Sequence, residues 1–153
     1  METKNWGIEI QNELYGHLSK KERQMKEILD QLYGIGTYTA EDDEYHSFLR
    51  SPKGHAMKLD RYYPELGLAF EFRGPQHEMY TPFMHKTRAD FAYLKACDAL
   101  KELQCFEHRV ALVVLKDEDD LSLDLIRRRT EEAIKGYQED VSFVDSKQVD
   151  DTE

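Results

Sequence analysis

The chain has 153 residues, 40% of them hydrophobic and 34% charged, which suits one globular domain with its own core and excludes wholesale disorder. It has no apolar run near the ~20 residues of a membrane span and no signal-peptide pattern, so we expect a cytoplasmic protein without a membrane anchor. It also has no C-x-x-C pair, so we expect neither a disulfide scaffold nor a zinc–cysteine module. The net charge of −10 predicts weak, salt-sensitive binding to a polyanion but does not exclude it, because residues 49–109 are mildly basic.

The first predicted element is a helix over Ser19–Tyr33, where apolar residues recur at helical spacing between positions 25 and 32. Ser19 followed by Glu22 has the pattern of a capping box, which predicts that the helix starts at Ser19. The acidic run 41–44 is expected to form a loop, and Tyr45–Arg50 a short strand.

The centre of the chain has the pattern of a β-hairpin. Two β-rich runs, Met57–Tyr63 and Leu68–Arg73, flank the four-residue connection Pro64–Gly67. If Tyr63 pairs with Leu68, the numbers of any two paired residues add up to 131. The Gly-Pro dipeptide after the second run ends that strand, because proline cannot continue the ladder.

This register brings two carboxylates together. Asp60 lies opposite Glu71 on one face, and Lys58 lies opposite Arg73 beside them. Facing carboxylates, ~5 Å apart at Cβ, are destabilising unless one takes a proton or a cation lies between them. Mg²⁺ prefers such oxygen ligands together with substrate phosphates, so the layout suits metal-assisted phosphodiester hydrolysis. The alternative is a solvated face on which acids and bases simply pair, and a one-residue slip would separate the acids.

The remaining chain predicts a helix, a buried strand and a second helix. The helix is expected over about His85–Gln104, the apolar strand over Ala111–Leu115 and the last helix over Ser122–Tyr137. Residues 138–153 are polar and acidic and are expected to form a disordered tail. The fold class is therefore α/β, a single domain over residues 1–137 with a mixed central sheet and helices on both faces.

A specific resemblance lies in the stretch Leu59–His77, which reads LDRYYPELGLAFEFRGPQH. It resembles the core of the PD-(D/E)XK, or restriction-endonuclease-like, superfamily, and within it the branch of the very-short-patch repair endonuclease and the EDxHD homing endonucleases. That branch has an Asp, a short turn, an apolar strand ending in an acid, and Gly-x-Gln-His. Asp98–Lys101 and Ala111–Leu115 match its continuation, an Asp-x-x-Lys helix and an apolar strand. The resemblance covers about residues 19–116 and implies a restriction-endonuclease-like mixed sheet flanked by helices.

The resemblance also implies roles for individual residues. Asp60 and Glu71 would bind Mg²⁺, for which Mn²⁺ could substitute, and Glu22 and Asp98 would complete the acidic site. His77 would act as general base or position the water, since histidine exchanges protons near neutral pH. The residues expected to contact nucleic acid are Lys58, Gln76, His85, Lys86, Arg88 and Lys101.

One position departs from the superfamily pattern. Arg73 stands where many members have lysine, and arginine can stabilise charge on a phosphate but cannot act as a base. Several other positions have ordinary structural interpretations: a helix cap for Glu22, a helix-surface ion pair for Asp98 with Lys101, an exposed loop histidine for His77 and a solvated basic patch for residues 85–88.

These observations together predict a Mg²⁺-dependent endonuclease that hydrolyses DNA phosphodiester bonds. RNA is the second substrate class compatible with the same chemistry, and a homodimer or a larger protein partner is the expected form of assembly. The alternative is a nuclease fold that has lost its activity and serves as a nucleic-acid-binding or protein-interaction subunit.

Overall fold

Helices stand at both ends of the described chain, and the strands lie between them. The structure is a computed structural model that describes residues 6–150, of which residues 6–15, 17–19 and 148–150 are described without side chains. In chain order the elements are α1 (Trp6–Tyr33), β1 (Glu41–Arg50), β2 (Ala56–Tyr63), β3 (Leu68–Arg73), the 3₁₀ turn η1 (Pro75–His77), α2 (Arg88–Glu107), β4 (Ala111–Lys116) and α3 (Leu123–Asp150).

The strands form one mixed sheet in the order β1-β2-β3-β4. β1, β2 and β3 are antiparallel neighbours, whereas β4 runs parallel to β3 and is reached through α2. The predicted mixed sheet is thus confirmed, and so is the hairpin register, because Tyr63 pairs with Leu68 and Arg61 with Phe70. Gly67 closes the hairpin turn with φ of 61°, a left-handed value that favours glycine.

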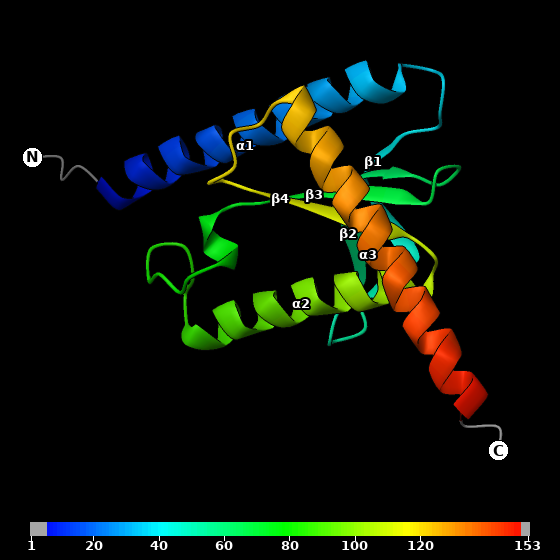
Figure 1. Cartoon of the computed structure of the whole chain (residues 1–153). Coiled ribbons are helices and arrows are strands. Elements are labelled where there is room, and N and C mark those ends of the chain that lie inside the picture. Colours follow the sequence, from blue (N-terminus) through cyan, green and yellow to red (C-terminus); the bar gives the residue numbers. More distant parts are fainter. Residues whose placement is uncertain (1–5, 151–153) are drawn as a thin grey trace, which may run out of the picture.

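Helices cover both faces of the sheet, with α1 and α2 on opposite sides and α3 crossing it (Figure 1). On one face, Met25 of α1 and Ile126 of α3 pack with Phe70 of β3 in one core cluster. On the other face, Cys105 of α2 packs with Leu59 of β2 in a second cluster. Burial of apolar side chains on both faces explains why the sheet forms between these helices.

The first helix is longer than predicted. α1 begins at Trp6, so Ser19 lies inside the helix and the predicted capping box of Ser19 and Glu22 is wrong. The Ser-x-x-Glu pattern marks a helix start only where no helical turn precedes it, and residues 6–18 supply such turns. The acidic run 41–44 is also not a loop but the start of β1, in which Glu41 pairs with Tyr62 of β2.

The later helices also differ from their predicted bounds. α2 begins at Arg88, because Thr87 and Asp90 form the capping box there. α3 continues to Asp150, so a disordered tail from residue 138 is wrong up to that point, and residues 151–153 lie outside the described chain. The helix that begins at Leu123 propagates through this stretch, which contains no glycine or proline to end it. Within residues 6–150, none of the helices combines the length and the apolar character that crossing a bilayer requires.

The two cysteines differ in reactivity. Cys105 is fully buried in the core, and burial raises the pKa of its thiol to about 12. Cys97 is only partly buried, although burial also raises the pKa of its thiol. We expect iodoacetamide at pH 8 to modify one thiol of the native chain, Cys97, and both thiols in urea, as counted by intact mass. Equal modification of both in the native chain would contradict this assignment of the core.

Candidate functional site

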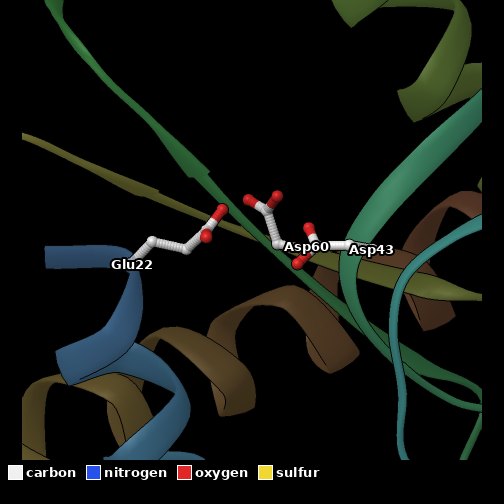
Figure 2. A group of neighbouring side chains, drawn as sticks. All are labelled: Glu22, Asp43 and Asp60. Carbon is white, nitrogen blue, oxygen red and sulfur yellow. The ribbon is translucent and has the colours of Figure 1, made fainter. Parts of the chain in front are cut away.

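Three carboxylates from three elements meet at one side of the sheet. Glu22 of α1, Asp43 of β1 and Asp60 of β2 each offer an oxygen, and these oxygens all lie within 4.8 Å of one another. Figure 2 shows Glu22 reaching toward Asp60 from one side and Asp43 standing on the other. Asp43 has φ of 52°, a left-handed conformation that aspartate tolerates better than most residues. We refer to Glu22, Asp43 and Asp60 as the acidic triad.

Asp60 is the most strongly perturbed member of the acidic triad. Burial, together with the negative charges of Glu71 and Glu22, raises the pKa of its carboxyl to about 9. One hydrogen bond opposes this shift, because the backbone N–H of Phe72 donates to Asp60 Oδ2 at 2.7 Å. Among the described residues, no lysine or arginine forms an ion pair with Asp60. A negative charge on Asp60 would thus be uncompensated within this part of the chain, and the raised pKa means that the carboxyl keeps its proton at neutral pH.

Lys26 supplies a positive charge to the other two members. Its Nζ lies 2.7 Å from Asp43 Oδ2 and 3.8 Å from Glu22 Oε2. Burial lowers the pKa of Lys26, but the hydrogen bond to Asp43 and the charge of Glu22 outweigh burial and raise it. A cation bound by the triad would therefore share Asp43 and Glu22 with this ammonium group.

The direction of Asp60 depends on an irregularity in β2. Leu59 belongs to the core cluster that faces α2, whereas the next two residues, Asp60 and Arg61, both contact α1. Arg61 is held there by Asp30 at 2.5 Å and by Asp42 at 2.6 Å. The alternation of side chains between the two faces is therefore broken at Asp60, and its carboxylate is directed toward α1.

The hairpin register predicts that Glu71 and Asp60 share a face. In the structure they do not, because Asp60 is directed toward α1. Glu71 Oε2 accepts a hydrogen bond from Lys101 Nζ of α2 at 3.1 Å, on the other side of the sheet. Its Oε1 accepts one from the backbone N–H of Asp60 at 3.2 Å. The two acids are neighbours, but Asp60 faces Glu22 and Glu71 faces Lys101. The joint binding of a metal by Asp60 and Glu71 stays a prediction.

A second group of predicted site residues meets on the α2 side of β3. His77 Nδ1 lies 2.7 Å from Asp98 Oδ2, and Arg73 Nε lies 3.7 Å from Asp98 Oδ1. Arg73 also donates to Glu102 Oε1 at 2.9 Å. Arg73 is 7% exposed, and its Nε, like Oε1 of Gln76, is buried without a hydrogen-bond partner among the residues that the structure describes. The structure thus gathers the site residues into two groups on opposite sides of the sheet, the acidic triad toward α1 and the group of Arg73, His77 and Asp98 toward α2.

The residues expected to contact nucleic acid have different surroundings. His85 is 6% exposed and its Nε2 bonds to the carbonyl oxygen of Gln76 at 2.9 Å, and its contact with a phosphate stays a prediction. Lys58 and Arg88 lie over the rings of Tyr45 and Tyr80, at 4.4 and 4.6 Å from the ring centroids. Lys86 is exposed, and Lys101 is paired with Glu71 as described above.

Asp43 and Lys26 are the site residues that sequence reasoning misses. The acidic run 41–44 is evident in the sequence. Because it is interpreted there as a loop, the sequence gives no reason to place it next to Asp60. Only the pairing of β1 with β2, in which Asp42 lies opposite Arg61, brings Asp43 next to Asp60. Lys26 lies one helical turn after Glu22, a spacing that any surface ion pair could have.

Comparisons with known proteins give two relatives, both uncharacterized. Protein 033L of Invertebrate iridescent virus 3 is 32% identical over 68 residues, which are 44% of this chain and 35% of that protein. Protein 307L of Invertebrate iridescent virus 6 is 33% identical over 57 residues, or 37% of this chain and 29% of that protein. The chain thus spans about a third of the length of these relatives. No family model and no solved structure matches it.

Proposed function

We propose that this chain is a divalent-cation-dependent nuclease that hydrolyses DNA phosphodiester bonds, with a restriction-endonuclease-like fold. The observation that carries the proposal is the acidic triad, and above all Asp60, whose charge has no cationic partner among the described residues. Asp60 and Glu22 repel each other when both are ionised, and a bound cation would take the place of the proton that the raised pKa of Asp60 implies. The resemblance of Leu59–His77 to the superfamily supports the same chemistry.

The donor set suits Mg²⁺ or Mn²⁺. Glu22, Asp43 and Asp60 offer only carboxylate oxygens, which hard divalent cations prefer, and no thiol or imidazole takes part in the triad. Asp60 and Glu22 are the residues that would hold the ion, and Asp43 would join them on release from Lys26. When bound, such an ion polarises a phosphoryl oxygen and stabilises the charge that develops on it.

The second group of residues lies on the opposite side of the sheet from the acidic triad, so handling the proton there requires a phosphate that reaches both sides where β2 and β3 cease to pair. Asp98 Oδ2 accepts a hydrogen bond from His77 Nδ1. The lone pair of His77 Nε2 would then take a proton from water. The water oxygen then bonds to phosphorus while the bond from phosphorus to the leaving sugar oxygen breaks. Arg73 would stabilise the charge on the phosphate, and its partner Glu102 is 57% exposed and so able to yield.

A cleavage assay tests the proposal. We expect the wild-type chain to nick or linearise supercoiled plasmid with Mg²⁺ or Mn²⁺ and to do neither with EDTA. Asp60→Asn should reduce the rate by more than ~100-fold, because metal stabilisation of the transition state amounts to several kcal/mol. Asp145→Asn, a change of an exposed aspartate far along α3, is the matched control and should cleave normally. A single-stranded RNA substrate run in parallel distinguishes the two substrate classes.

A binding subunit is the second candidate, favoured by the pairing of the local cations. Arg73, Lys101 and Lys26 already have carboxylate partners within the chain, which leaves them less available to phosphates. For such a subunit, neither wild type nor Asp60→Asn would cleave DNA, and the substitution would leave its binding to DNA or to a protein partner unchanged. That result would overturn the nuclease proposal.

A further inference from the structure

The side chains of Asp60 and Glu71 each form a hydrogen bond with the opposite strand at the point where β2 and β3 cease to pair. The residue pairs of this antiparallel ladder end at Arg61 and Phe70. At the next position, side chains replace the backbone ladder. The N–H of Asp60 donates to Glu71 Oε1 at 3.2 Å, and the N–H of Phe72 donates to Asp60 Oδ2 at 2.7 Å. Each acid thus satisfies a backbone N–H of the opposite strand.

Both oxygens of the Glu71 carboxylate already accept a hydrogen bond in this arrangement. Oε1 accepts from the backbone of Asp60, Oε2 accepts from Lys101 Nζ at 3.1 Å, and Glu71 is only 4% exposed. A divalent cation bound at Oε2 would lie within a few ångströms of the Lys101 ammonium, in a buried place where like charges repel strongly. Glu71 also lies outside the acidic triad, whose oxygens approach one another to within 4.8 Å.

We infer that Glu71 is a positioning residue, which fixes the backbone of Asp60 and so aims the Asp60 carboxylate at Glu22, and that it does not bind the cation itself. Lys101 takes part by holding the Glu71 carboxylate toward α2 through its hydrogen bond to Oε2. The inference rests on the proposed function, because it concerns the cation that the acidic triad would hold. The inference makes Glu22, instead of Glu71, the second ligand of the cation.

Binding of Mn²⁺ alone to the full chain, followed by calorimetry and by the electron paramagnetic resonance signal of free Mn²⁺, tests this assignment. Asp60→Asn and Glu22→Gln should lose measurable binding, because each removes a ligand. Glu71→Ala should weaken binding by roughly 10- to 100-fold, the usual effect of removing a residue that orients a ligand. Glu71→Gln should bind within about threefold of wild type, because its amide oxygen still accepts from the Asp60 N–H.

The controls separate this inference from the proposed function. Glu65→Gln, a change of the exposed glutamate in the hairpin turn, should leave binding unchanged. If Glu71→Ala fails to fold because Lys101 is left unpaired, the double variant Glu71→Gln/Lys101→Met, which removes both charges, should still bind Mn²⁺. Loss of binding in Glu71→Gln equal to that in Asp60→Asn would make Glu71 a ligand, and unchanged binding in a folded Glu71→Ala would remove its positioning role. Absence of binding in wild type would instead overturn the proposed function and this inference with it.

Discussion

Asp60→Asn is expected to make the chain more stable than wild type at pH 8 when divalent cations are removed by EDTA. In the folded chain, burial and the charges of Glu71 and Glu22 raise the pKa of Asp60 to about 9, against ~3.9 in the unfolded chain. Asparagine carries no charge, and its side-chain oxygen can still accept the hydrogen bond from the Phe72 N–H. Since one pKa unit corresponds to ~1.4 kcal/mol and pH 8 lies about four units above the unfolded pKa, we expect a gain in unfolding free energy of up to roughly 6 kcal/mol.

The sign of this effect depends on pH in a defined way. A carboxyl whose pKa is raised by folding binds more protons in the folded chain, so wild type loses stability as the pH rises from about 4 to about 9. Below pH 4 the carboxyl is protonated in both states and the difference between the variants vanishes. Urea unfolding of both proteins at pH 4, 6 and 8 measures the difference. An Asp60→Asn variant less stable than wild type at pH 8 would show that the charge of Asp60 is compensated.

Added Mn²⁺ should reverse the order of the two proteins. A ligand that binds only the folded state stabilises it by mass action, and only wild type keeps the Asp60 ligand. A metal ligand is expected to lower the stability of the folded chain when the ion is absent and to raise it when the ion is bound. A residue of a surface ion pair would change the stability little, whether it is substituted or Mn²⁺ is added.

The hairpin was predictable because its signals are local. Pro64 and Gly67 bound a turn between two β-rich runs, and that turn sets the register of Tyr63 with Leu68. The buried strand Ala111–Lys116 was predictable too, since an apolar run without polar alternation is typical of a strand covered on both faces. These elements place β3 between the end of β2 and β4, which is the framework of the site.

The direction of the site carboxylates was not predictable from the same signals. Strict alternation along β2 would place Asp60 on the face of Glu71, but Arg61 is drawn toward α1 by Asp30 and Asp42. Asp30 and Asp42 are distant from Arg61 in sequence, so the broken alternation is a tertiary effect with no signal in the hairpin itself. The role of Asp43 depends on the same contacts, because β1 must first pair with β2.

Arg61→Met is expected to lower the unfolding free energy by about 3–5 kcal/mol, the usual cost of breaking a buried ion pair by removing one partner. Arg61 is 5% exposed, and it donates to Asp42 of β1 and to Asp30 of α1. Its removal would leave two carboxylates without their cation and would also remove the bond to the carbonyl oxygen of Lys26. Urea unfolding at pH 7 measures the loss, and Arg128→Met, at an exposed arginine of α3, is the matched control.

The same variant should weaken Mn²⁺ binding although Arg61 offers no ligand. Arg61 ties the strand of Asp43 and the helix of Glu22 to β2, so its loss frees the elements that carry two members of the acidic triad. The weakening should persist in calorimetry at low temperature, where the variant is folded by circular dichroism, which separates it from simple unfolding. Normal Mn²⁺ affinity in the folded variant would mean that α1 and β1 hold the triad without Arg61, and packing of Met25 and Leu29 against the sheet would then be the force that assembles the site.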